Sequence, residues 1–100
     1  MTKILIFLAS IGCVPDSYII PSNATFYMDG VVYIRPDMMQ DHIIVHELVH
    51  DCQYDKSGGG AKTWAEHTRR EYQAKQIETQ WIEMYGINRE LRPYVFQLLQ

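Results

Sequence analysis

Hydrophobic residues are spaced differently in successive parts of the chain, and the first apolar run predicts a short helix. It extends from Ile4 to Leu8 and is followed by small residues and by Gly12. Glycine suits the left-handed position just beyond a helix end, so we expect a buried first helix that ends at Gly12. The alternative is that residues 1–12 are a cleaved signal peptide, which would remove core that a small domain needs.

The next part of the chain, residues 18–35, is rich in β-branched and aromatic residues, which favour strands. It contains three short runs: Tyr18-Ile19-Ile20, Thr25-Phe26-Tyr27-Met28 and Val31-Val32-Tyr33-Ile34. Asp29-Gly30 separates the last two runs and is a dipeptide typical of a two-residue hairpin turn. We therefore expect a small antiparallel sheet that contains a β-hairpin.

Two long helices are predicted in the second half of the chain. From Met39 to Tyr54 the apolar residues are too closely set for a strand and fit a helix, which is followed by a glycine-rich linker. Thr63 and Glu66 have the spacing of a capping box, which marks the start of a second helix. This helix can extend to Tyr85, and Gly86 favours its end there.

Length and composition narrow the class of protein. One hundred residues are enough for one modest hydrophobic core, so we expect a single α+β domain over residues 1–100. Nine basic and 12 acidic residues give a net charge of −3 without a basic run, which disfavours binding to nucleic acid. No apolar run approaches the ~20 residues of a transmembrane helix, and we expect a soluble monomer.

The two cysteines, Cys13 and Cys52, are far apart in the sequence and match neither a zinc knuckle nor a thioredoxin-type pair. They can form a disulfide only if the chain enters an oxidising compartment. Because the first residues fit a helix better than a signal peptide, we favour the cytoplasm over secretion, and the pairing stays open.

The residues with the clearest chemistry are His46-Glu47-Leu48-Val49-His50, an HExxH sequence inside the first long helix. Residues four apart share one helix face, so both imidazoles can reach one Zn²⁺ ion. Glu47 lies beside them and can act as the general base that accepts a proton from zinc-bound water. Ordinary helix histidines are the alternative, but the apolar neighbours predict a buried helix, where uncompensated polar groups are costly.

A catalytic zinc site needs a third protein ligand and an open position for water. Metzincins have this ligand six residues after the second histidine, where this chain has Lys56, and the Asp-bearing downstream stretch of aspzincins is missing. Gluzincins use a glutamate on a second helix. Glu71, two turns into the helix capped by Thr63, fits that position better than Glu66, which belongs to the capping box.

At 100° per residue, one stripe of the second helix is expected to face the HExxH helix, and it contains His67, Glu71, Ala74, Glu78, Trp81 and Tyr85. The small side chain of Ala74 would let the helices approach, and Trp81 and Tyr85 fit the core. His67 fits a cleft-facing position better than a zinc ligand. Glu78 fits either a partner of a ligand or a charge at the edge of the stripe.

The donor that would stabilise the oxyanion of a tetrahedral intermediate is left open by the sequence. The candidates are the phenols of Tyr33, Tyr54 and Tyr72. Asp51, directly after the motif, fits a solvated helix charge at least as well as a group that orients a ligand, and we assign it no role.

The segment Ile44–Gln53, the glycine-bearing loop and the segment Arg70–Ala74 together resemble the minigluzincins and related small prokaryotic or phage HExxH peptidases. In those families HExxH, a loop of about 20 residues and E-x-x-A recur. The resemblance covers residues 31–85. It implies a minimal zincin-like fold that hydrolyses peptides or proteins.

The resemblance also implies roles for individual residues. His46, His50 and Glu71 would bind zinc, and an edge strand, Val31 to Arg35, would line the cleft and pair with an extended peptide. Many members of this group are minimal domains held latent by a terminal segment, which here would be Leu91 to Gln100. Larger gluzincins often have an Asp that supports a ligand histidine at the position of Lys75.

The sequence thus predicts a zinc-dependent metallopeptidase in which one catalytic Zn²⁺ ion and Glu47 activate water against a peptide bond. The alternative is a zincin-like domain that binds a metal or a partner without turnover.

Overall fold

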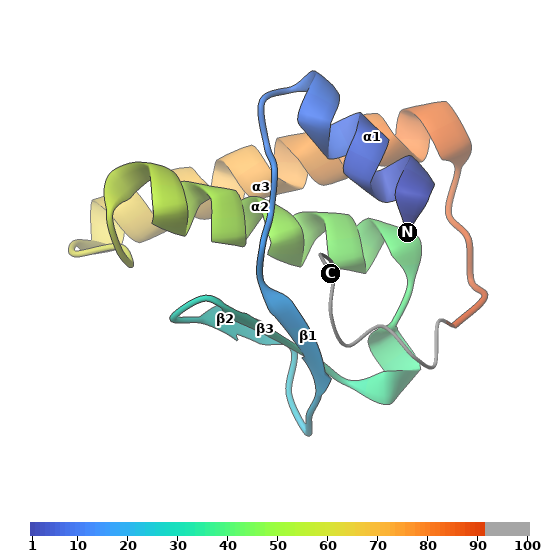
Figure 1. Ribbon diagram of the computed structural model, residues 1–100, viewed down its shortest axis with the longest axis horizontal. Helices are drawn as coiled ribbons and strands as arrows, with labels where there is room; N and C mark the ends of the chain where they lie inside the picture. The colour runs from blue at the N-terminus through green and yellow to red at the C-terminus, as the bar shows by residue number, and fades with distance from the viewer. Residues whose placement is uncertain (92–100) are drawn as a thin grey trace.

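The computed structural model describes residues 1–91 and places a small sheet on one side of α2, with α1 and α3 on the other (Figure 1). The elements are α1 (Thr2–Ser10), β1 (Tyr18–Pro21), β2 (Phe26–Met28), β3 (Val31–Ile34), the 3-10 helix η1 (Pro36–Met38), α2 (Asp41–Ser57) and α3 (Trp64–Tyr85). This α+β arrangement agrees with the class predicted from the sequence.

The three strands form a mixed sheet in the order β1-β3-β2. The predicted hairpin is present: β2 pairs antiparallel with β3, and Asp29 and Gly30 both have positive φ, 48° and 85°. The prediction of a wholly antiparallel sheet is wrong, because β1 runs parallel to β3 on its other side. The strand with fully buried Val32 and Ile34 takes the centre, since a central strand buries its side chains best.

The expectation of an edge strand at Val31 to Arg35 is therefore wrong as well. The strand at Val31–Ile34 has a neighbour on each side. Among residues 1–91, the strand on the HExxH side whose outer edge has no neighbouring strand is β2, one segment earlier in the chain. Neighbouring hairpin strands have similar composition, and pattern alone could not decide which of them is inside.

The helix ends follow the predicted signals. Gly12 has φ 83° just beyond α1, and Ile4, Phe7 and Leu8 are buried, so the first residues form a helix that is part of the core. At α3, Thr63 Oγ1 accepts a hydrogen bond of 3.0 Å from the Glu66 amide. The reverse bond of the capping box differs, because Glu66 Oε2 accepts from the Lys62 amide (3.2 Å) instead of the Thr63 amide.

One buried cluster joins the helices to the sheet. Its members include side chains of α1, β1, β3, α2 and α3: Ile4, Phe7, Leu8, Ile19, Val32, Ile34, Ile44, Val45, Leu48, Val49, Ala74 and Trp81. Trp81 meets Phe7 edge to face with ring centroids 5.3 Å apart, as expected for a core residue. Tyr85 lies at the rim of the core, 43% exposed, against Trp81.

Cys13 and Cys52 form a disulfide that ties the connection between α1 and β1 to α2, with their Cα atoms 5.6 Å apart. Disulfides are typical of oxidising compartments, so this bond weighs against the cytoplasmic location, which stays a prediction. Within residues 1–91, no helix has both the length and the apolar character of a membrane span. The terminal segment expected to hold the protein latent, Leu91 to Gln100, lies outside the described part of the chain except for Leu91.

Candidate metal centre

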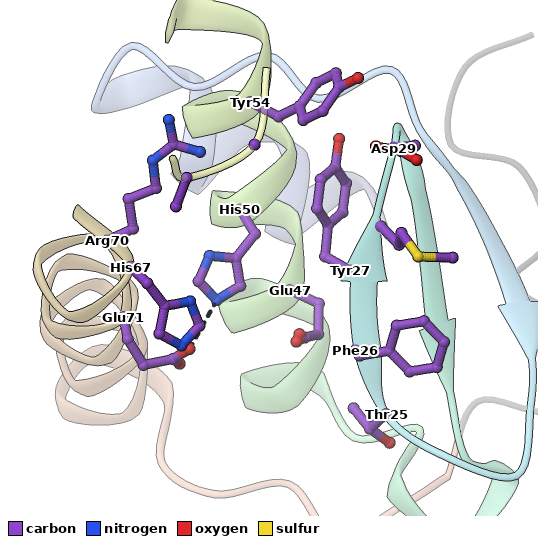
Figure 2. Close-up of a pocket in the computed structure, with 13 residues that line it drawn as sticks. Thr25, Phe26, Tyr27, Asp29, Glu47, His50, Tyr54, His67, Arg70 and Glu71 are labelled. Atoms are coloured by element: carbon purple, nitrogen blue, oxygen red, sulfur yellow. Dashed lines mark ion pairs between the residues drawn. The ribbon is translucent and has the colours of Figure 1, made fainter. Parts of the chain in front are cut away.

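The HExxH residues lie in the middle of α2, opposite Glu71 of α3 (Figure 2). The carboxylate of Glu71 contacts both histidines: Oε1 contacts His46 Nε2, and Oε2 lies 3.3 Å from His50 Nε2. Fully buried Ala74, one turn further along α3, allows the two helices to approach. The structure thus brings together the three side chains that the sequence predicts as metal ligands.

The other nitrogen of each imidazole has its own partner. His46 Nδ1 lies 2.9 Å from Glu78 Oε1, and His50 Nδ1 lies 2.8 Å from Gln53 Oε1. An ionised carboxylate only accepts hydrogen bonds, so Nδ1–H of His46 donates to Glu78. When this ring is neutral, it presents the lone pair of Nε2 to Glu71.

The orientation of Gln53 follows from its other contacts. Gln53 Nε2 donates to the backbone carbonyl of Arg70 (2.9 Å) and to Gln73 Oε1 (2.8 Å). A backbone carbonyl can only accept, which leaves the amide oxygen of Gln53 to face His50. His50 Nδ1–H is thereby engaged, and its Nε2 lone pair also points to Glu71.

Three acceptors therefore converge on one point between α2 and α3. Two Nε2 lone pairs and a carboxylate have no proton to share unless one imidazole is charged, and a cation satisfies all three. Two imidazoles with one carboxylate are the protein ligands of many catalytic zinc sites. The donor set fits Zn²⁺.

The charges of the carboxylates shape the titration of this cluster. Burial lowers the pKa of His46, but the hydrogen bond to Glu78 and the negative charge of Glu71 outweigh it, so the pKa lies above its usual value. For His50 burial prevails and the pKa is lowered. Burial raises the pKa of Glu71, but the charges of His50 and His46 shift it below its usual value.

Glu47 projects from α2 toward β2, one turn of the helix from His50 (Figure 2). It is 6% exposed, and its Oε2 atom is buried without a hydrogen-bond partner among the described residues. Burial raises the pKa of this carboxyl to about 7. Ligand atoms of His46, Glu47 and His50 lie within 4.8 Å of one another, so the Glu47 carboxylate is within reach of a metal-bound group.

A cavity of about 330 Å³ opens beside Glu47, His50 and Glu71. Strand β2 and its flanking residues form one wall from Thr25 to Asp29, and the start of α3 forms the other. The cavity thus lies between the outer edge of a strand and the cluster of acceptors. Such a groove suits an extended chain segment.

Some of the other site residues considered from the sequence line this cavity, and others lie outside it. Tyr54 lines it, whereas Tyr72 is 65% exposed and not part of its wall, and Tyr33 stacks on Phe26 outside it. His67 lines the cavity, which agrees with the cleft-facing position expected for it. Glu66 is paired with Arg70 at 2.6 Å, away from the histidines, as its capping role predicts.

Three residues with clear contacts received no firm role from the sequence. Glu78 holds His46, and its place on the stripe seven residues after Glu71 was the signal for it. Gln53 holds His50 from three residues further along the same helix. For Asp51 a solvated helix charge was expected at least as much as a group that orients a ligand. The residue is instead fully buried, and it accepts a hydrogen bond of 2.8 Å from the Tyr27 hydroxyl.

Comparison with models of known protein families, with curated proteins and with solved structures gives no match to this chain. The resemblance to the minigluzincins therefore rests on the motif residues and their spacing alone.

Proposed function

We propose that this protein is a zinc-dependent metallopeptidase with a minimal zincin-like fold of the gluzincin type. The observation that carries the proposal is the convergence of two histidine Nε2 atoms and the Glu71 carboxylate beside the orphaned Glu47 oxygen. An ordinary pair of helix histidines would not need both Nδ1 atoms fixed so that the Nε2 atoms face a common point.

His46, His50 and Glu71 would hold the metal. Bound Zn²⁺ would polarise a peptide carbonyl and lower the pKa of a coordinated water toward neutrality. Glu78 and Gln53 would keep the imidazoles in the tautomer and orientation that ligation requires.

Glu47 would act as the general base and then as the general acid. Its carboxylate accepts the proton of the attacking water and afterwards donates it to the nitrogen of the leaving amine. A pKa near neutrality suits a group that must both take up and release a proton at neutral pH.

The substrate in this proposal is a peptide or protein in extended conformation. In the described part of the chain no strand pairs with the outer edge of β2, and this strand forms the cavity wall that faces the acceptor cluster. A peptide that adds to this edge would pass directly in front of Glu47.

The decisive experiment compares Glu47→Gln with the wild type. We expect purified wild type to hold one zinc ion per chain by elemental analysis and to cleave an unfolded protein such as reduced casein. Glu47→Gln should keep its zinc and lose cleavage by at least about 100-fold, because a general base contributes about that much. The exposed Glu83→Gln on α3 is the matched control and should retain activity.

The outcomes separate the two classes of function. Zinc that binds without any cleavage by the wild type would leave a metal-binding domain and reject the peptidase. Protein without stoichiometric zinc would reject the metal centre itself.

A further inference from the structure

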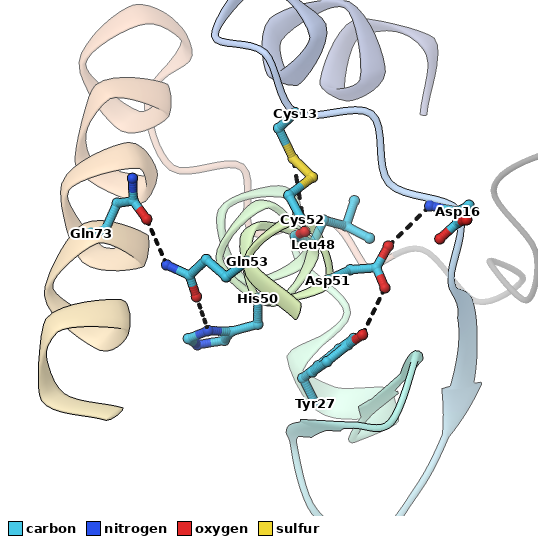
Figure 3. The surroundings of a disulfide bond; sticks show 9 residues. All are labelled: Cys13, Asp16, Tyr27, Leu48, His50, Asp51, Cys52, Gln53 and Gln73. Carbon is cyan, nitrogen blue, oxygen red and sulfur yellow. Dashed lines mark hydrogen bonds between the residues drawn. A yellow bond between two sulfur atoms is a disulfide. The ribbon is translucent and has the colours of Figure 1, made fainter. Parts of the chain in front are cut away.

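Three successive residues after the HExxH motif, Asp51, Cys52 and Gln53, connect α2 to three different neighbours (Figure 3). Successive helix residues point about 100° apart, so this turn of α2 reaches in three directions. Gln53 bonds to α3, Cys52 forms the disulfide with Cys13, and Asp51 points to the opposite side from Gln53.

Both oxygens of Asp51 are engaged. Oδ1 accepts from the Tyr27 hydroxyl at 2.8 Å, and Oδ2 accepts from the Asp16 amide at 3.0 Å. The residue is fully buried, so each of these bonds replaces water that a carboxylate would otherwise hold. A buried carboxylate is costly to retain, and its bonds here join α2 to the sheet side of the molecule.

Tyr27 is the middle residue of β2, the strand that forms the cavity wall. This strand has three residues, and among residues 1–91 its ladder bonds connect it to β3 alone. The bond from Tyr27 to Asp51 connects it across to α2, one residue after the ligand His50. The ring of Tyr27 also packs against that of Tyr54, with centroids 5.8 Å apart.

We propose that Tyr27 and Asp51 are positioning residues, which set the separation between the edge strand β2 and the HExxH helix. The inference rests on the proposed peptidase function. A peptide that pairs with β2 has its reacting carbonyl placed by the strand, whereas the acceptor cluster and Glu47 are placed by α2 and α3. The Tyr27–Asp51 bond connects the strand β2 to the helix α2, so it fixes where the peptide lies relative to the groups that act on it.

The test is Tyr27→Phe, which removes the hydroxyl and keeps the ring. We expect kcat/KM for an unfolded protein substrate to fall by about 10- to 100-fold, the scale of an error of about 1 Å in placement. Zinc affinity should change by less than about 2-fold, because no metal ligand or partner of a ligand is altered. Tyr33→Phe, the same change on the neighbouring strand and outside the cavity, is the control and should behave as wild type.

Two inhibitors make the readout specific for the strand. Acetohydroxamate binds a zinc ion without reaching β2, and its affinity should be equal in Tyr27→Phe and wild type. A peptidyl hydroxamate that extends along β2 should bind the variant about 10-fold more weakly. A general loss of structure would weaken both compounds together.

Hydrogen exchange of the zinc-free protein gives a second measurement that does not depend on turnover. The amides of Phe26–Met28 should exchange faster in Tyr27→Phe, while those of β1 keep their wild-type rates.

Unchanged kinetics, inhibitor affinities and exchange in Tyr27→Phe would overturn the positioning role and leave the peptidase intact. Absence of any cleavage by the zinc-loaded wild type would overturn the proposed function, and the role of β2 in substrate binding with it.

Discussion

The two faces of α2 are stabilised in different ways. One face carries Ile44, Val45, Leu48 and Val49, which are all buried in the cluster shared with α1 and the strands. The face toward α3 carries His46, His50 and Gln53, whose contacts are almost all polar. Burial of an apolar side chain is favourable whatever the exact partner, whereas a polar side chain gains little unless a specific group is in the right place.

We therefore expect the polar face to be the part of the helix that a bound cation would stabilise. Glu71, Glu78 and Glu47 lie around two imidazoles, and burial disfavours these charges. The apolar face needs nothing beyond the chain itself. We expect the apolar face to determine whether the protein folds and the polar face to determine what the folded protein binds.

The largest effect should come from Leu48→Ala on the apolar face. Leu48 is fully buried, so its truncation leaves a cavity and should lower the free energy of unfolding by about 2–5 kcal/mol. Urea unfolding in the presence of a chelator measures this without a contribution from metal. Ile6→Ala, at a position 65% exposed on α1, should cost less than about 0.5 kcal/mol. Equal losses in the two variants would contradict the assignment of the core.

The disulfide acts on the apolar side and should affect folding more than binding. Replacing Cys13 and Cys52 together by Ser removes a cross-link between residues 39 apart and should cost about 2–4 kcal/mol. Urea midpoints and zinc titrations of the double variant would measure the two effects separately. Native wild type should have no free thiol by a colorimetric thiol assay, and two thiols per chain would show that the bond is absent.

Zinc should stabilise the folded protein through the polar face alone. At a free zinc concentration 100 times the dissociation constant, the free energy of unfolding should rise by about 2.7 kcal/mol. His50→Gln should lose this rise and keep most of the stability of the metal-free protein, because it leaves the apolar face unchanged. Thermal unfolding with and without zinc measures the difference. A zinc-dependent rise of equal size in His50→Gln would place the metal elsewhere.

Several features of the fold could be read from local sequence. The positive φ angles after α1 and between β2 and β3 follow from Gly12 and from Asp29-Gly30, and Thr63 marks the start of α3 because its hydroxyl caps the helix. Each of these signals acts between residues that are close in the chain and are therefore also close in space.

The arrangement of the strands and the partners of the ligands could not be read in this way. The central place of β3 depends on which strand lies beside it, and β1 is ten or more residues away. Asp51 looks like any helix carboxylate until Tyr27 is placed opposite it. The motif located the histidines, but their orientation depends on contacts across two helices.

The smallest effect should come from Glu78, which lies on α3 opposite the polar face of α2 and is not expected to touch the metal. Glu78→Gln removes a negative charge from the Nδ1–H of His46 but keeps an oxygen that can accept the bond. Loss of a charged partner of a ligand histidine costs about 10- to 100-fold in metal affinity, and the retained acceptor places this variant at about 10-fold, or 1.4 kcal/mol. Competition with a chromogenic zinc chelator measures the change.

Glu83→Gln on the same helix makes the identical chemical change away from the histidines and should leave zinc affinity unaltered. If both variants bind zinc as tightly as the wild type, Glu78 is merely a charge at the edge of the α3 stripe that faces α2. The orientation of His46 is then set by α2 alone. A larger loss in Glu78→Gln than in Glu71→Gln would instead show that Glu78 ligates the metal, because removal of a direct ligand must cost more than removal of its support.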